Sequence, residues 1–250
     1  MTAPVGADRR GGRVGIIVPS SNTNLEPDCA LLVPCEATAH FTRLGGYDVE
    51  AIPGVEEMRG LAMASLDGPL DLLRAARVKV IGYACASATL SCGWTFDRHL
   101  RADMEAKAGV PAVTVAGAMI EALAVLKASR IGFASPYVGD LNRKAVAFFA
   151  EAGIQAVNCA DIGAALSSLE QGRLTPRDAF ELGLAADHPD AEAIVIGCTD
   201  LRAVEVIGAL EMELGKPVVT SNQALVFACL ARIGIETNSV ESGGALYKLR

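Results

Sequence analysis

Short apolar runs alternate with amphipathic stretches along most of the chain, so strands and helices are expected to follow one another. Runs rich in valine and isoleucine that end at glycine or proline predict strands buried on both faces. We expect strands at residues 13–19, 37–44, 78–83, 111–115, 130–136, 193–196 and 215–221. Helical patterns cover residues 24–33, 65–77, 93–109, 116–127, 201–214 and 224–233. This alternation predicts parallel sheets with right-handed crossovers.

The second half of the chain repeats features of the first half in the same order. The segment 130–136 matches 13–19, and 215–221 matches 109–115. Between these pairs, each half has a buried strand that leads to a cysteine, Cys85 or Cys198. Valine-rich strands followed by glycine recur in any α/β protein, but the shared order and the cysteines favour an internal duplication. The predicted fold is α/β, with two pseudo-symmetric doubly wound domains, parallel sheets and the active site in the cleft between them.

This duplication also sets the expected domain boundaries. Residues 13–115 form the N-terminal half and residues 116–221 the C-terminal half, and a helix at 222–234 crosses back to join the first half. The polar, Gly/Arg-rich residues 1–12 predict a flexible terminus rather than a secretory signal.

Composition and charge narrow the possible partners. The chain is 51% hydrophobic and 20% charged, as in globular proteins. A net charge of −7 without a Lys/Arg cluster argues against nucleic acid and anionic membranes as partners. Glu121 and Lys127 interrupt the longest candidate membrane span, so we expect a cytoplasmic protein with no membrane partner.

The motifs of the common cofactors and metals are missing from the sequence. It contains neither Cys-x-x-Cys nor His-Glu-x-x-His, and its three histidines are scattered. A Walker A loop and a strand-linked Gly-x-Gly-x-x-Gly are also missing. We therefore expect no metal and no cofactor, with any chemistry performed by side chains alone. The seven widely spaced cysteines predict reduced thiols rather than a disulfide framework.

Cys85 and Cys198 are the candidate catalytic residues. Each ends a predicted buried strand, at the sheet edge where open α/β proteins bind ligands. A helix predicted from residue 201 would place Cys198 near a helix N-terminus, which favours thiolate over thiol. The alternative is that both are small apolar core residues, as expected for the other five cysteines.

Two thiols that face one small ligand can perform two kinds of chemistry. One thiol can remove a proton from carbon while the other donates to the opposite face, which inverts a stereocentre. Alternatively, one thiolate adds to an activated double bond, the new single bond rotates, and elimination gives the other geometric isomer. Either reaction needs donors for a carboxylate. The candidate substrate-binding residues are Ser20, Ser21, Asn22, Ser87, Tyr137 and Thr199. The hydroxyl and amide residues could instead cap helices, and Tyr137 could be an ordinary packed ring.

Four segments carry a resemblance to a known family. They are Val-Pro-Ser-Ser-Asn-Thr at 18–23, Gly-Tyr-Ala-Cys at 82–85, Ala-Ser-Pro-Tyr at 134–137 and Pro-Val-Val-Thr at 217–220. Over about residues 13–234 the chain resembles the maleate cis-trans isomerase branch of the aspartate/glutamate racemase superfamily. The resemblance implies a cofactor-independent enzyme, often dimeric, with Cys85 as nucleophile and Cys198 as its acid/base partner. It also implies that Asn22 and Tyr137 bind the substrate carboxylates.

Some positions differ from that pattern. Amino-acid racemases carry Ala-Cys-Asn-Thr where this chain has Ala-Cys-Ala-Ser at 84–87, which argues against a free amino acid as substrate. Maleate isomerases carry an asparagine where Ser168 aligns. The absence of that amide from this chain would weaken the binding of a second substrate carboxylate. Arylmalonate decarboxylases are also similar but typically lack the first cysteine, so Cys85 argues against decarboxylation. Ectoine-utilisation proteins are similar as well.

The sequence therefore leaves two hypotheses from different classes. The first is a cofactor-independent isomerase of a small carboxylate or dicarboxylate that works through Cys85 and Cys198, with a racemase or decarboxylase as its nearest alternative. The second is a two-lobed protein that binds a carboxylate without turnover, in which the cysteines take no part.

Overall fold

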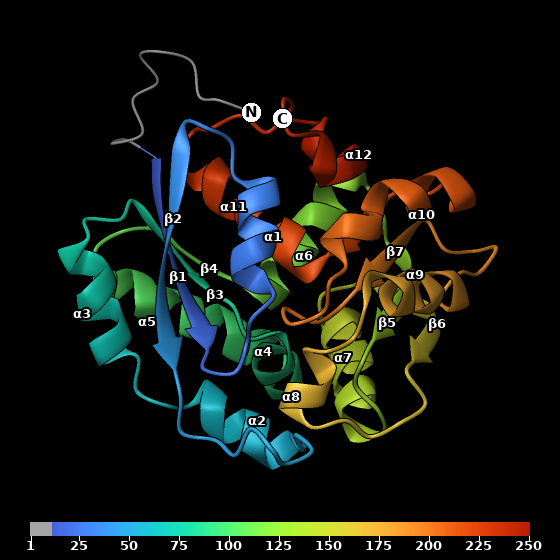
Figure 1. Ribbon diagram of the computed structural model, residues 1–250, viewed down its shortest axis with the longest axis horizontal. Helices are drawn as coiled ribbons and strands as arrows, with labels where there is room; N and C mark the ends of the chain where they lie inside the picture. The colour runs from blue at the N-terminus through green and yellow to red at the C-terminus, as the bar shows by residue number, and fades with distance from the viewer. Residues whose placement is uncertain (1–11) are drawn as a thin grey trace.

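Two four-stranded parallel sheets form the framework of the protein, as a computed structural model that describes residues 12–250 shows (Figure 1). The first sheet has the order β2-β1-β3-β4, from β1 (Gly12–Pro19), β2 (Ala37–Leu44), β3 (Val80–Tyr83) and β4 (Ala112–Thr114). The second has the order β6-β5-β7-β8, from β5 (Arg130–Ser135), β6 (Gln155–Asp161), β7 (Ala193–Ile196) and β8 (Val218–Thr220). The matching orders confirm the predicted α/β fold with two similar halves. The expected flexible terminus at 1–12 lies outside the described residues, except for Gly12, which begins β1.

The central strands are the ones that the hydrophobic runs predicted best. Every residue of β3 and of β7 is buried, because helices cover both faces of each sheet. The outer strands β2 and β6 have mixed, partly exposed residues, as edge strands do. Burial on both faces therefore explains why β3 and β7 read as unbroken apolar runs.

Helices surround both sheets. Before β5 the chain forms α1 (Leu25–Leu32), α2 (Val55–Ala62), α3 (Asp67–Ala75), α4 (Ala86–Cys92), α5 (Trp94–Ala108) and α6 (Val115–Leu126). After β5 it forms α7 (Asp140–Glu151), α8 (Ser168–Gln171), α9 (Pro176–Ala185), η1 (Val204–Val206), α10 (Ile207–Leu214), α11 (Ser221–Arg232), η2 (Glu241–Gly243) and α12 (Gly244–Tyr247). Within residues 12–250, no helix is long and apolar enough to cross a membrane.

Helices α6 and α11 pack together at the centre of the molecule (Figure 1). Each starts directly after a strand with a threonine cap: the hydroxyl of Thr114 accepts from Gly117 N–H, and that of Thr220 from Gln223 N–H. Helix α11 also contacts β3 and β4 of the first sheet. A Cβ at Gly82 of β3 would lie 3.1 Å from Leu225 of α11, so this glycine permits the close approach.

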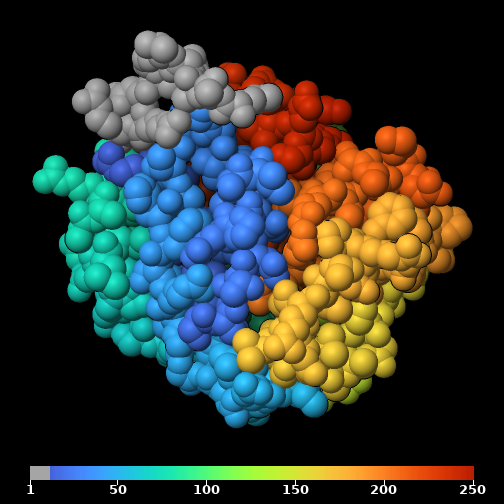
Figure 2. Space-filling view, in the orientation of Figure 1, coloured from blue at the N-terminus to red at the C-terminus, as the bar shows by residue number. Residues whose placement is uncertain are grey.

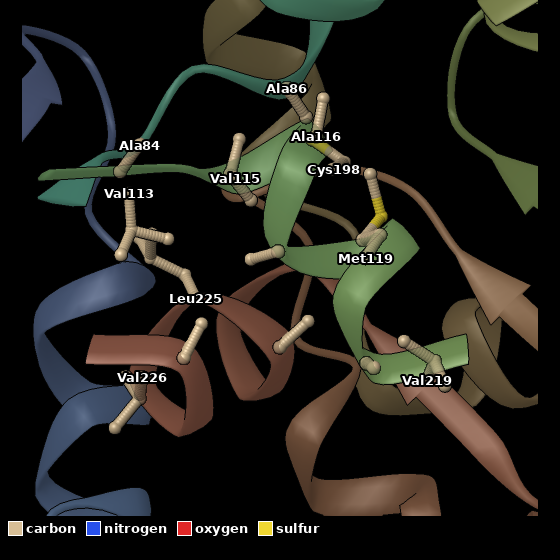
Figure 3. Close-up of a cluster of buried hydrophobic side chains, with 14 of the residues drawn as sticks. Ala84, Ala86, Val113, Val115, Ala116, Met119, Cys198, Val219, Leu225 and Val226 are labelled. Atoms are coloured by element: carbon tan, nitrogen blue, oxygen red, sulfur yellow. The ribbon is translucent and has the colours of Figure 1, made fainter. Parts of the chain in front are cut away.

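The cysteine loop of the second half borders this helix pair. Figure 3 shows Cys198 in the buried cluster that includes Ala86, Ala116 and Met119, near the start of α6. In the space-filling view, α1 of the first half and residues around α8 of the second half meet along a seam (Figure 2). The loops at the carboxyl ends of both sheets therefore lie close together across the boundary between the halves.

The prediction that a helix begins at residue 201 is wrong. After β7 the chain forms a loop, then the short η1, and α10 begins only at Ile207. The loop carbonyls bind other segments instead of continuing a helix: Asn222 Nδ2 donates to Thr199 O at 3.0 Å, and Asn24 Nδ2 to Asp200 O at 2.9 Å. Cys198 therefore does not lie at a helix N-terminus.

Candidate active site

A cavity between the two halves is lined by both candidate cysteines. It lies at the carboxyl ends of β1, β3 and β7, where a ligand site is expected in this architecture. Its lining residues are Pro19, Ser21, Asn22, Tyr47, Met58, Leu61, Cys85, Ala86, Ser87, Tyr137, Ser168, Gln171, Cys198, Thr199 and Asp200. Of the eight candidate site residues, only Ser20 is not among them.

Ser20 points away from the cavity. Its side chain is exposed, and its N–H donates to Leu44 O at 2.9 Å, which turns the chain at the end of β1. The next residue, Ser21, faces the cavity, and its hydroxyl lies 2.8 Å from the Tyr47 hydroxyl. The placement of Ser20 beside the substrate is therefore corrected, because consecutive residues of this turn face opposite sides.

Cys85 lies directly at the start of a helix. It is the N-cap residue of α4, and its side chain is 5% exposed, at the cavity wall. Burial raises the pKa of its thiol, while hydrogen bonds from Ala88 N–H and with the Ser87 hydroxyl lower it. Ser87 Oγ lies 3.7 Å from Cys85 Sγ and also donates to Met58 Sδ at 3.0 Å. The alternative that Ser87 only caps a helix is wrong, because Cys85 is the N-cap of α4 and Ser87 contacts its thiol at the cavity.

Cys198 has a different environment. Its side chain is also 5% exposed, but it lies in the loop after β7 and accepts from Asp200 N–H at 3.4 Å. Burial and the nearby Asp200 carboxylate raise the pKa of its thiol to about 12, although hydrogen bonds from Asp200 N–H and Tyr137 lower it. The sequence predicted a thiolate favoured by a helix dipole. The structure instead favours a neutral thiol at Cys198.

Tyr137 lies beside both cysteines in the cavity wall. Burial raises the pKa of its hydroxyl well above the usual value, the Cys198 and Cys85 thiols act in the same direction, and the Ser87 hydroxyl acts against it. The turn that carries it is fixed by Asn142, whose Nδ2 donates to Tyr137 O at 2.6 Å and whose Oδ1 accepts from Ser135 Oγ at 2.6 Å. Tyr137 is therefore a neutral, oriented donor at the cavity.

Asn22 and Thr199 join the two halves at the cavity. Asn22 Nδ2 donates to Thr199 Oγ1 at 3.1 Å, and Thr199 Oγ1 donates to Ala84 O at 3.1 Å. The other end of the Asn22 amide accepts from Asn24 N–H at 3.1 Å and from Leu25 N–H at 3.0 Å. Asn22 Oδ1 therefore satisfies two N–H groups at the start of α1. The same contacts fix how its Nδ2 faces the site.

The sequence did not identify several lining residues as site residues. Tyr47 belongs to a turn-rich surface segment with no periodic pattern, and Met58 and Leu61 belong to α2, which was not predicted. Asp200 follows the Gly-Cys-Thr segment directly, and that adjacency was the one signal that could have found it. Gln171 comes from α8, as does Ser168, which the sequence singled out only as the position of an asparagine in maleate isomerases.

The lining of the cavity is neutral apart from one carboxyl group. None of the described residues that line it is a lysine, arginine or histidine, and Asp200 is its one carboxylate. Across residues 12–250, no group of three His, Cys, Asp or Glu residues is arranged to hold a metal ion. An anionic ligand here would be held by hydroxyl, amide and N–H donors.

The fold and the cavity define an α/β protein of two similar halves with a thiol from each half at a shared site. A family model described as arylmalonate decarboxylase matches residues 14–247, so the chain belongs to that family. The resemblance to maleate isomerases and to arylmalonate decarboxylases is thereby confirmed.

Relatives with established names fall into two activities. The maleate isomerase of Pseudomonas putida KT2440 is 28% identical, over 94% of this chain and 96% of that protein. The arylmalonate decarboxylase of Bordetella bronchiseptica is 27% identical, over 83% of this chain and 82% of that protein. Among solved structures, the maleate isomerase Iso from Pseudomonas putida S16 matches with a TM-score of 0.86 at 27% identity. That match covers 94% of this chain and 98% of the other.

Proposed function

We propose that this protein is a cofactor-independent isomerase of a small unsaturated carboxylate or dicarboxylate, with Cys85 as nucleophile and Cys198 as proton donor. The observation that carries the proposal is that one cysteine from each half lines the same cavity. A thiol used only for packing has no need to line a cavity beside polar groups. The relatives named maleate isomerase support the same reaction class.

The environments of the two thiols support different roles. Burial raises the pKa of both thiols, but at Cys85, the N-cap of α4, the Ala88 N–H and the Ser87 hydroxyl act against that rise and no carboxylate of residues 12–250 adds to it. Cys198 lies beside the Asp200 carboxylate, which favours its protonated form. Cys85 is therefore assigned as the attacking group and Cys198 as the acid.

In the proposed reaction, the Cys85 thiolate forms a C–S bond to one carbon of the C=C bond, and the Cys198 thiol gives its proton to the other carbon. The former double bond is now single and rotates. The Cys198 thiolate then takes back a proton from that carbon, the C–S bond breaks, and the C=C bond re-forms in the other geometry. Both cysteines return to their starting states, so no external acid, base or redox partner is consumed.

Charge that develops on the substrate carboxylate during addition needs donors near it. The neutral Tyr137 hydroxyl and the Asn22 amide lie at the cavity and are fixed by their neighbours. Both are donors that need no change of protonation during the reaction. These residues are proposed to hold the carboxylate, with Ser21, Ser87 and Thr199 around it.

The size of the cavity favours a small substrate over one with an aromatic ring. Its volume is about 40 Å³, compared with roughly 150 Å³ for a protein cavity that binds benzene. A four-carbon unsaturated acid demands less rearrangement of the walls than an arylmalonate does. Decarboxylation of a malonate is the second candidate function, because the family model that matches the chain is named for that activity.

The test is a proton NMR assay of the purified protein in heavy water with maleate, other small cis-unsaturated acids and phenylmalonate as separate substrates. The proposal expects the trans isomer from at least one unsaturated acid. Loss of carbon dioxide from phenylmalonate without any isomerisation would establish the second candidate instead. A ligand that raises the melting temperature but is never converted would identify a binding protein.

A further inference from the structure

The Asp200 carboxylate holds the Asn22 loop from across the boundary between the halves. Its Oδ1 accepts from Thr23 N–H at 3.0 Å, from Asn24 N–H at 3.2 Å and from Asn24 Nδ2 at 2.9 Å. These donors follow Asn22 directly in the first half, while Asp200 follows Cys198 and Thr199 in the second. One carboxylate therefore fixes two cavity-lining loops relative to each other.

The end of α8 is bound into the same junction. Asn24 Nδ2 also lies 2.9 Å from Asp200 O and 2.9 Å from Gly172 O. Gly172 has φ −67° and ψ −14°, which any residue adopts. A Cβ there would nevertheless lie only 2.7 Å from Asp200 Oδ2. The carboxylate, and not the backbone conformation, is thus what requires glycine at this position.

Asp200 also acts on the cysteine two residues before it. Its N–H donates to Cys198 Sγ at 3.4 Å, and its negative charge lies close enough to disfavour a thiolate there. The other titratable groups that act on Cys198 are Tyr137 and Cys85. Arg43 of β2 acts on Asp200 from the first half, and its Nη1 donates to Asn22 O at 2.7 Å.

We propose that Asp200 is a positioning residue with two effects: it clamps the Asn22 loop to the Cys198 loop, and it keeps Cys198 a protonated thiol. The second effect rests on the proposed function, in which Cys198 is the proton donor. The first effect stands on the hydrogen bonds of Asp200, Asn24 and Gly172 alone and applies to any ligand of this cavity.

The proposal predicts a pH dependence. Burial raises the pKa of the Asp200 carboxyl to about 6, although the N–H donors of Thr23 and Asn24 lower it. Above pH 6 the carboxyl is ionised and both effects operate. Below pH 6 it becomes protonated and loses its charge, so its hold on the N–H donors of the Asn22 loop weakens, while Cys198 stays protonated at this pH in either case. We therefore expect kcat/KM of the wild type to fall below about pH 6.

The first experiment measures the thiol without any turnover. Iodoacetamide alkylation of the Cys198 peptide is followed by mass spectrometry between pH 7 and 10 in wild type, Asp200→Asn and Asn24→Ala. Asparagine keeps an accepting oxygen and removes the charge, so Asp200→Asn should react on the order of tenfold faster at each pH. Asn24→Ala keeps the charge and should react within about threefold of wild type.

The second experiment measures the clamp on the substrate established by the isomerase assay. Asn24→Ala and Gly172→Ala should raise KM about tenfold at pH 8 with a smaller change in kcat, because the Asn22 loop is no longer held. Asp200→Asn mimics the protonated carboxyl, so it should show at pH 8 the lower kcat/KM that wild type shows below pH 6, and no further fall near pH 6. Circular dichroism and melting temperatures show whether each variant is folded.

The outcomes separate this proposal from the proposed function. Equal alkylation rates in folded Asp200→Asn and wild type would overturn the charge effect, whether or not a substrate has been found. Unchanged KM in both Asn24→Ala and Gly172→Ala would overturn the clamp. If no substrate is converted, the clamp is measured instead by the maleate concentration that half-protects Cys85 from alkylation. Equal protection in wild type and both variants, or no protection of wild type, would then overturn it.

Discussion

The loops after β3 and β7 occupy equivalent places in the two halves but have different shapes. Cys85 leads directly into α4, whereas Cys198 is followed by a loop and η1 before α10 begins at Ile207. The first cysteine has a helix N-terminus beside it and the second has a carboxylate, Asp200. The duplication thus supplies two buried thiols whose pKa values are both raised, and the difference between the two loops gives them different neighbours: backbone N–H and hydroxyl groups at Cys85 and a carboxylate at Cys198. A repeated motif does not imply a repeated role.

Removing either thiol is expected to have the largest effect and would test this comparison directly. Cys85→Ala removes the covalent route and should lower kcat/KM by about a thousandfold or more. Cys198→Ala removes the acid and should cost roughly 10²- to 10⁴-fold. The rates are measured by NMR with the substrate identified above. Cys159→Ser, at an exposed edge-strand position, is the matched control and should retain wild-type activity.

The same pair of variants also distinguishes the roles of the two thiols. If Cys85 attacks and Cys198 protonates, the Cys198→Ala protein still forms a substrate adduct on Cys85, and intact-protein mass spectrometry detects its added mass. Cys85→Ala forms no adduct. An adduct on Cys198 in the Cys85→Ala protein would reverse the assignment.

Tyr137→Phe is expected to have the next largest effect. The change keeps the ring and removes the hydroxyl beside Cys198 and Ser87. Loss of one fixed donor beside developing charge should lower kcat by roughly a hundredfold. A fall in kcat with little change in melting temperature would support a role in the reaction. A large fall in melting temperature with kcat unchanged would instead make Tyr137 a packing residue.

The smallest expected effect concerns stability, through Asn222 and Asp28, which hold the Cys198 loop on the side away from the cavity by a hydrogen bond to Thr199 O. Asn222 Nδ2 donates to Thr199 O and to Asp28 Oδ2, the latter at 2.7 Å. Asp28 is only 2% exposed. Asn222 Oδ1 is buried and has no hydrogen-bond partner among residues 12–250. Burial raises the pKa of the Asp28 carboxyl to about 7, although the hydrogen bond from Asn222 lowers it. The unfolded carboxyl titrates near 3.9. The folded state therefore binds the proton more tightly, and stability falls as pH rises from about 4 to 7.

The variant Asp28→Asn removes this titration and places an amide that can donate to Asn222 Oδ1. Between pH 5 and 8, urea unfolding of the wild type should lose roughly 2–3 kcal/mol through Asp28, and the variant should lose that much less. Asp71→Asn, at an exposed position of α3, should keep the wild-type pH dependence. The same pH dependence in Asp28→Asn as in wild type would show that Asp28 is ionised in the folded protein at low cost.

Helix α4 and the loop after Cys198 could not be predicted from the sequence, and each has a physical reason. Helix α4 has the sequence Ala-Ser-Ala-Thr-Leu-Ser-Cys, which is small and polar without a 3.6-residue apolar period. The loop after Cys198 was predicted as helix because Leu201 to Leu214 has helical spacing. Its carbonyls nevertheless bind Asn24 and Asn222, which are distant in sequence. Tertiary hydrogen bonds therefore overrode the local pattern.

The sequence alone determined the strands of residues 12–250 except the edge strand β6, the doubled architecture and the two cysteines at strand ends, because burial on both faces imposes unbroken apolar runs that are visible locally, whereas β6 is partly exposed. Only the tertiary structure decided which neighbours each thiol has. Asn22 meets Thr199 and Asp200 meets Asn24 across more than 170 residues of chain. Contacts of that kind leave no periodic trace in a sequence, since they depend on how the two halves are placed against each other.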